Sequence, residues 1–546
     1  MKLKKNSFLQ GAFVATFGIV LCKILGMLYV IPFYSIIGEQ GGALYGYAYN
    51  IYSIFLGISS AGIPLAMSKI ISEYNTLGYY NAKEKAFKIG RRLLNVVGIV
   101  SFLVLFIFAD KIGYLIIGDI TGGNSPQDVA FVIRVIATAI LIIPILSVYR
   151  GYFQGHKYIT PTSISQIIEQ TVRVSIIIIG SYLMYKVFNL SLKATVAFAV
   201  FSATIGGFTS WLYLYWKSKT NKKQFIKTNT KTKEPIINEK VILKKIIYYS
   251  VPFIMIDLFR SLYNSVDIIM LVKTLVNDLG YNIQDAESIM SVISTWGLKI
   301  NMIIISIVTG VMTSLIPNLT SSFVRNDMKE VNDKINKTYQ IVLYLAVPMT
   351  VGLSLLAKPV WTIFYGSSAY GPLTYQYLVF VALATTIFTS TVTITQVMKE
   401  YKTVFICLIA GMLIKVLFNI PFLYGFHKMG LPAFYGSISA TILGFLISSI
   451  ICMIVLRKKY KLSYEHTIKE LINIFFAVVT MALVISLLKY IIPITTTNRF
   501  LAIGIVSVYT LIGALIYFGI TLKTNTITNI FGNGILNTIK NKIKRK

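Results

Sequence analysis

The chain has 546 residues, of which 55% are hydrophobic and 13% are charged, and its formal net charge is +32. Soluble proteins carry about 25% charged residues, so this composition excludes an ordinary soluble protein. Apolar runs of more than twenty residues with one charge or none are too long for the short alternating strands of a membrane β-barrel. The composition therefore predicts an all-α polytopic membrane protein.

Hydropathy predicts fourteen transmembrane helices. Their expected ranges are 8–37, 43–68, 86–109, 129–149, 161–187, 194–216, 246–272, 288–317, 335–357, 373–398, 403–424, 432–456, 468–491 and 500–522.

The basic residues are divided unequally between the loops on the two sides of these spans. The side that holds both termini carries 37 Lys and Arg, and the other side carries 8. This bias predicts cytoplasmic N- and C-termini, because basic loops stay on the cytoplasmic side. It also favours anionic lipids, and not nucleic acid, as partners of the basic loops.

The two halves of the chain resemble each other. At an offset of 249 residues, Ser72 corresponds to Ser321, Lys85 to Lys334, Lys88 to Lys337, Leu94 to Leu343 and Arg150 to Lys399. Two six-helix lobes in one orientation are therefore expected, related by a pseudo-two-fold axis along the membrane normal. The expected parts are an N-lobe (1–217), a basic, weakly structured cytoplasmic linker (218–245), a C-lobe (246–456), two extra helices (457–522) and a basic cytoplasmic tail (523–546).

Three cations fall at similar mid-membrane depths, at about 1.5 Å of helix rise per residue: Lys23, Arg260 and Lys299. A charge at this depth is costly and marks a functional site. If the three converge between the lobes, they form an anion site. Lys23 and Lys299 have no acidic residue within seven positions on their own helices, which favours a ligand role.

Internal pairing is the alternative for the other intramembrane charges. Arg260 has Asp257 and Asp267 on roughly the same helix face, and Glu169 precedes Arg173 by four residues, the favourable order for a structural pair. Asp257 and Asp267 are also candidates to bind Na⁺ or a proton. The sequence has no ATPase or HExxH motif and no cysteine spacing for a metal, which favours a transporter over an enzyme.

Two long segments carry a family resemblance. RGYFQGHKYITPTSISQIIEQTVRV (150–174) and KILGMLYVIPFYSIIGEQGGALYGYAYNIYSIFLGISSAGIPLAMSKIISEY (23–74) closely resemble Gram-positive MurJ/SpoVB-type flippases. These form part of the polysaccharide-transport branch of the multidrug/oligosaccharidyl-lipid/polysaccharide (MOP) exporter superfamily. The resemblance covers the whole chain and implies a protein of the bacterial plasma membrane.

The resemblance implies a function in cell-wall synthesis. Members move lipid II, an undecaprenyl diphosphate that carries the disaccharide-pentapeptide of peptidoglycan, from the inner to the outer leaflet without ATP. In the family, a cavity lined by the first, second, seventh and eighth spans holds the diphosphate. Lys23 matches a cavity arginine of the family, and Lys299, in GLKINMIIIS, matches its basic position on the eighth span. The last two spans (468–491 and 500–522) are expected to form a groove for the lipid tail.

The sequence departs from the family at two places. Tyr29 stands where many members have a second arginine on the first span, and NIYSIF (50–55) lacks the expected basic residue of the second span.

Several alternatives remain open. The substrate can be another prenyl-diphosphate glycan, such as a capsule, teichoic-acid or sporulation unit. A cation-coupled drug exporter of the MATE type is disfavoured by the basic mid-membrane charges, and a scaffold for the cell-wall machinery would use the basic loop 217–245 and the tail. Transport is expected to need no cofactor, and either the membrane potential, Na⁺ or H⁺ can drive it.

Overall fold

A computed structural model describes residues 8–60, 62–225, 235, 237–491 and 498–532, without the side chains of residues 8, 9, 11–13, 15, 16, 252, 260, 311 and 313–317. The described chain is helical and contains no strand, as predicted. It forms two compact units, Met1–Trp296 and Gly297–Lys546, which we call unit 1 and unit 2.

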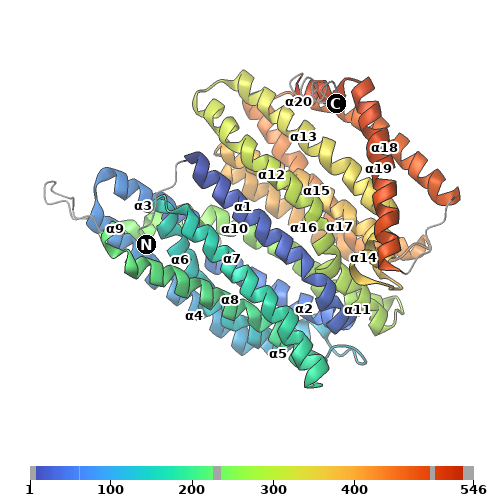
Figure 1. The fold of residues 1–546 in the computed structure, drawn as a ribbon, viewed down its shortest axis with the longest axis horizontal. Helices are drawn as coiled ribbons and strands as arrows, with labels where there is room; N and C mark the ends of the chain where they lie inside the picture. Colours follow the sequence, from blue (N-terminus) through green and yellow to red (C-terminus); the bar gives the residue numbers. More distant parts are fainter. Residues whose placement is uncertain (1–7, 61, 226–234, 236, 492–497, 533–546) are drawn as a thin grey trace. The chain divides into compact units, whose positions relative to one another are not determined.

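The residues that the structure describes in unit 1 form eleven α-helices and five short helical turns. Its elements are α1 (Phe8–Leu28), α2 (Val30–Ser60), α3 (Ile63–Leu77), α4 (Tyr80–Ile117), α5 (Pro126–Ala137), η1 (Thr138–Leu141), α6 (Ile143–Gly155), α7 (Ile159–Ser175), η2 (Ile176–Gly180), η3 (Leu183–Val187), α8 (Leu192–Thr220), α9 (Lys222–Phe225), α10 (Glu239–Lys273), η4 (Thr274–Asp278), α11 (Ile283–Ser291) and η5 (Val292–Trp296). Within the unit, α7 lies between α1 and α8 (Figure 1).

The described part of unit 2 contains nine α-helices. They are α12 (Gly297–Val324), α13 (Met328–Leu355), α14 (Ala357–Tyr365), α15 (Gly371–Val397), α16 (Tyr401–Lys428), α17 (Tyr435–Tyr460), α18 (Glu465–Ile491), α19 (Arg499–Lys523) and α20 (Thr526–Phe531). Helix α18 packs between α13 and α19.

Twelve helices or helix runs in the described part are long and apolar enough to cross a membrane. They agree with twelve of the predicted spans within a few residues at most ends. The other two predicted spans, 8–37 and 246–272, fall on α1 and α10, where some side chains lie outside the described residues. The count of fourteen spans therefore stays a prediction.

The first two predicted spans are divided differently in the structure. We expected a loop at 38–42, but helix α2 runs through this stretch with a sharp kink at Gly38 (φ 62°, ψ −158°). The chain next turns at Gly62 (φ 69°), where a Cβ would lie 2.5 Å from the Phe253 Cβ. Only glycine adopts these backbone angles readily and tolerates this approach, and hydropathy does not detect either requirement.

Loops that the charge bias assigns to one side do meet in space. Within unit 1, Lys245 Nζ lies 2.5 Å from Glu73, and within unit 2, Lys459 Nζ lies 2.6 Å from Glu400. Burial alone would raise the pKa of Glu400, but hydrogen bonds from Lys459 and Tyr460 outweigh it and hold the pKa below its usual value. Within each unit, loops that are predicted to lie on the same side of the membrane therefore do lie close together.

The two compact units do not coincide with the predicted lobes. Helices α10 and α11 belong to unit 1, because α10 packs against α2, α3 and α4. The backbone of Asp257 and Leu258 on α10 lies 3.7 Å from the point where a Cβ on Gly57 of α2 would stand. A Cβ at this position would be in ordinary van der Waals contact with α10, so the two helices pack directly on each other here. The lobe boundaries given by the repeat remain a prediction.

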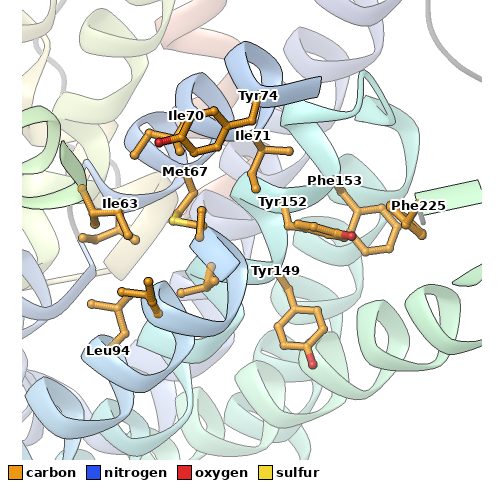
Figure 2. Packing of buried hydrophobic residues seen from close by; sticks show 14 of the residues in the cluster. Ile63, Met67, Ile70, Ile71, Tyr74, Leu94, Tyr149, Tyr152, Phe153 and Phe225 are labelled. Atoms are coloured by element: carbon orange, nitrogen blue, oxygen red, sulfur yellow. The ribbon is translucent and has the colours of Figure 1, made fainter. Parts of the chain in front are cut away.

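The connection at 218–245 is anchored by one aromatic residue. Phe225 of α9 is buried against Tyr152 and Phe153 of α6, with ring centroids 5.1 and 5.0 Å away (Figure 2). The Phe225 carbonyl oxygen also accepts a hydrogen bond of 2.6 Å from the buried Lys83 of α4. The start of the predicted linker is therefore fixed to unit 1 by apolar burial and one charged hydrogen bond.

We expect Phe225→Ala to release this anchor. Truncating a buried Phe costs about 3–5 kcal/mol, and here the loss removes the aromatic packing between α9 and α6. Limited trypsin digestion of the purified protein should therefore cut the lysine-rich stretch 217–245 at least several-fold faster than in the wild type. Tyr248→Ala removes an exposed aromatic ring of α10 and should leave the rate unchanged. Equal cleavage of both variants would contradict the anchor.

Candidate functional site

Helix α1 carries Lys23 and packs on α7 through a face of small residues. A Cβ on Gly18 would lie 3.1 Å from Ser163 Cβ, and one on Gly26 would lie 3.2 Å from the Gln170 side-chain nitrogen. These two glycines are eight residues apart, so they lie on one face of the helix. Close packing on this face leaves the opposite side of α1 exposed.

Lys23 lies at the border of that exposed side. Its side chain is half-buried, and its neighbours Ile19, Val20 and Ile24 are exposed. Among the residues that the structure describes, no carboxylate lies within ion-pair distance of Lys23 and no hydrogen-bond acceptor contacts its ammonium group. A cation in an apolar helix that lacks an internal partner is poised for an external anion.

The other predicted site residues are placed less completely. Lys299 is half-buried near the start of α12 in unit 2 and already interacts with other groups. Asp257 is half-buried on α10, Asp267 is buried there, and both interact with neighbouring groups. The side chain of Arg260 lies outside the described residues. The convergence of three cations, and the pairing of Arg260 with either aspartate, therefore stay predictions.

The predicted pair between Glu169 and Arg173 is wrong. Glu169 of α7 instead binds Arg150 of α6, with an N–O distance of 2.6 Å. Arg150 also donates to Ser165 Oγ at 3.1 Å, which lies four residues before Glu169 on the same face of α7. Because this face is turned toward α6, the long-range partner displaces the local one.

Arg173 turns toward helix α2. Its guanidinium lies over the ring of Tyr49, 5.6 Å from the centroid, and donates to the Tyr49 hydroxyl at 3.4 Å. Tyr49 in turn stacks on Tyr45 with the ring centroids 5.5 Å apart. The second span lacks the basic residue that the family resemblance implies, but Arg173 of α7 places a cation beside α2. No local signal in one sequence indicates such a contact.

Unit 2 contains an apolar cavity of about 360 Å³ among α13, α18 and α19. Pro348 and Gly352 of α13, Met481 and Ile485 of α18, and Tyr509 and Gly513 of α19 are among the residues that line it. Gly352 has open space around it, because no atom lies within 4 Å of a Cβ placed there. The cavity lies at the two C-terminal helices, where the sequence resemblance implies a groove for a lipid tail.

We expect Glu169→Gln to destabilise the protein. The side chains of Arg150 and Glu169 are only 14% and 20% exposed, and breaking a buried ion pair from one side costs about 3–5 kcal/mol. Thermal unfolding in detergent should therefore shift to a clearly lower temperature. Glu330→Gln is the matched control, because Glu330 pairs with Arg325 and Lys334 at the surface and such pairs contribute about 1 kcal/mol or less. Equal shifts would argue against a buried pair.

The family model for polysaccharide biosynthesis proteins matches residues 8–323. Lipid II flippase MurJ of Bacillus subtilis is 32% identical over 493 residues, which is 89% of this chain and 89% of that protein. Stage V sporulation protein B of the same organism is 25% identical over 252 residues, or 46% of each chain.

Two solved structures share the fold. A structure of lipid II flippase MurJ in an inward closed conformation matches with a TM-score of 0.62 at 17% identity, covering 93% of this chain and 98% of that one. An inward-facing MATE family multidrug transporter of the MOP superfamily matches with a TM-score of 0.62 at 14% identity, covering 82% and 98%. These likenesses confirm the predicted all-α fold of the MATE type. The chain is therefore a multi-pass membrane protein of the polysaccharide biosynthesis family, in the group that contains the lipid II flippase MurJ of Bacillus subtilis.

Proposed function

We propose that this protein is a lipid II flippase that carries the lipid from the inner to the outer leaflet by alternating access. The observation that carries the proposal is the extended similarity to MurJ, which spans 89% of both chains. The lone ammonium group of Lys23 and the apolar cavity of unit 2 supply the two chemical features that such a substrate requires.

The diphosphate of lipid II is the part that cannot cross hydrocarbon alone, because an unpaired charge in the bilayer interior is costly. Lys23 offers a cation that no described residue neutralises. A lysine binds phosphate as a compact point charge and is less geometrically selective than a bidentate arginine, which suits a site that must release its ligand. Arg260 and Lys299 are proposed to act with it on the same group.

The prenyl tail is proposed to occupy the apolar cavity bounded by α13, α18 and α19. Each buried methylene contributes about 0.8 kcal/mol, so even partial insertion of the tail gives substantial affinity. Lining groups such as Met481 and Ile485 present no charge to the tail.

Orientation and energy coupling follow from the charge distribution. Both termini are proposed to be cytoplasmic, with the basic loops and tail in contact with anionic lipids and available to the cell-wall synthesis machinery. An inside-negative membrane potential pushes an anionic headgroup outward and can drive the cycle. Na⁺ or H⁺ bound at Asp257 or Asp267 is the other proposed source of coupling.

A related prenyl-diphosphate glycan is the second candidate substrate, because stage V sporulation protein B also matches part of the chain. The diphosphate and the prenyl tail would be recognised by the same residues. Only the glycan differs, so a substrate assay separates the two candidates.

We expect Lys23→Ala to abolish most transport. In cells depleted of their own lipid II flippase, the wild type should restore lipid II on the outer leaflet, whereas the variant should be slower by about tenfold or more. The reason is that a hydrogen bond to a charged group contributes about 1.5–3 kcal/mol. Lys23→Arg should retain transport, since it keeps the charge.

Lys186→Ala is the matched control, because it removes an exposed cation from the same unit. Lys299→Ala tests the second cation in the same assay. Wild-type rates in well-expressed Lys23→Ala and Lys299→Ala proteins would show that the anion site is wrong. A correctly inserted wild type that restores no lipid II would instead favour another prenyl-diphosphate glycan.

The tail cavity has a separate test. Gly352→Phe should fill the cavity and reduce lipid II transport by about tenfold, since excluding two methylenes costs about 1.6 kcal/mol. Gly504→Phe is the matched control, because a Cβ on Gly504 of α19 also meets no atom within 4 Å and Gly504 does not line the cavity. Equal transport by both variants would exclude the cavity as the tail site.

A further inference from the structure

A carboxyl group is buried at one end of unit 1, and no cation among the described residues pairs with it. Glu287 of α11 is fully buried, and its Oε1 accepts two hydrogen bonds of 2.9 Å from Asn124, one from the backbone N–H and one from the side-chain amide. Its Oε2 has no hydrogen-bond partner among the described residues. Hydropathy does not indicate Glu287, because it predicts that the eighth span begins at residue 288, whereas α11 begins at Ile283.

Glu287 lies at a junction of three segments. The Asn124 amide that binds Glu287 also donates to the Gln40 backbone oxygen of α2 at 3.1 Å, so one side chain links α2, the loop 118–125 and α11. A Cβ on Gly123 would lie 2.9 Å from Glu287 Oε2. The glycine therefore lets the loop close directly over the carboxyl group.

The groups around Glu287 do not neutralise a negative charge. Helix α2 contributes the fully buried Tyr47, whose hydroxyl lies within electrostatic range and has no hydrogen-bond partner among the described residues. Asp128 of α5 is also within electrostatic range and is paired with Lys193 at 3.1 Å.

The remaining elements packed on α11 add no cation. Glu39 of α2 accepts a hydrogen bond of 2.6 Å from Ser288, next to Glu287, and another from Tyr34. In the described parts of α10 and η4, no charged side chain lies within ion-pair or hydrogen-bond distance of Glu287. The surroundings of Glu287 are thus neutral or acidic.

A buried carboxylate in such surroundings is expensive, because an isolated charge loses several kcal/mol of solvation when it leaves water. One proton on Oε2 removes the charge without disturbing the hydrogen bonds that Oε1 accepts. The Tyr47 hydroxyl is a nearby polar group that also lacks a partner. The closed junction therefore favours the neutral acid.

We propose that Glu287 is a proton-binding site and that its protonation holds the junction of α2, the loop 118–125 and α11 closed. The proton adds to Oε2 and leaves from it, and no other bond changes. When the proton leaves, the three segments enclose an unpaired charge and separate. This site differs from the predicted coupling residues Asp257 and Asp267, which lie on α10.

The loop also gives the site a route to water. A surface cavity of about 660 Å³ is lined by Gly122, Gly123 and Ser125 of the same loop, together with Asp110 and Asp119. The predicted topology places this loop on the outer side of the membrane. Outside protons would then bind through this loop and close the outer end after the lipid has left, and they would leave by the same route when the end opens. This coupling of protonation to closure rests on the proposed function.

Infrared spectroscopy of the full-length protein in liposomes tests proton binding directly, without lipid II. A protonated carboxylic acid has a carbonyl stretch that a carboxylate lacks. We expect this band at neutral pH in the wild type, its loss at alkaline pH, and its absence from Glu287→Gln. Glu39→Gln is the matched control, because both oxygens of Glu39 accept hydrogen bonds and the band should persist.

Tyr47→Phe is a second variant, which keeps the Glu287 carboxyl group and serves as a test even if Glu287→Gln does not fold. Removing the neighbouring hydroxyl should shift the band but not abolish it. A wild type without the band at any pH, or a band that persists unchanged in both Glu287→Gln and Tyr47→Phe, would overturn the proposal. The proposal would also be overturned if NaCl, without added acid, stabilised the wild type against unfolding but did not stabilise Glu287→Gln. That result would indicate that Glu287 binds a cation and not a proton.

Transport assays in the same liposomes test the coupling. A step that needs one bound proton slows by about tenfold per pH unit above its midpoint, so wild-type flipping should fall in this way. Glu287→Gln resembles the neutral acid and keeps the junction closed, so its flipping should be slow at every pH. A wild-type rate that is flat with pH, despite the infrared band, would overturn the coupling. Absence of lipid II transport by a wild type that shows the band would count against the proposed function alone.

Discussion

The structure depends on the cost of placing charge in hydrocarbon, which requires a partner for almost every buried charged group. Arg150 meets Glu169, and the fully buried Lys415 of α16 donates to the Ser437 carbonyl at 3.0 Å and to Thr441. Lys23 departs from this rule among the described residues. We propose that the missing partner of Lys23 is the anionic headgroup of the substrate.

The substrate proposed here needs two unlike environments, and the chain provides both by different means. The apolar cavity of unit 2 is open at Gly352, where a Cβ would have no neighbour within 4 Å, whereas α18 and α19 approach closely at Gly513, where a Cβ would lie 2.9 Å from Ile485. The cation on α1 stays accessible because the helix uses its glycine face to pack on α7. Small residues thus allow close helix contact between α1 and α7 and leave an opening in unit 2, depending on which helix faces them.

Glu287 differs from Lys23 in its burial and in the sign of its charge. A lone cation that is half-buried can wait for a ligand, whereas a fully buried carboxyl group must lose its charge in place. Its hydrogen bonds from Asn124 tie the protonation state to the positions of three segments. A single proton can therefore alter how the end of unit 1 is packed, which is the kind of two-state element that alternating access requires.

The sequence by itself determined the helical class, most span boundaries, the grouping of the basic loops and the unusual position of Lys23, because hydropathy and charge are read within one helix at a time. It also identified the family through two long motifs. Only the tertiary structure decided that Glu169 pairs with Arg150 and not with Arg173, that α2 kinks at Gly38, and that Glu287 is buried. These features depend on contacts between residues far apart in the chain, such as Asn124 and Glu287, and no local periodicity encodes them.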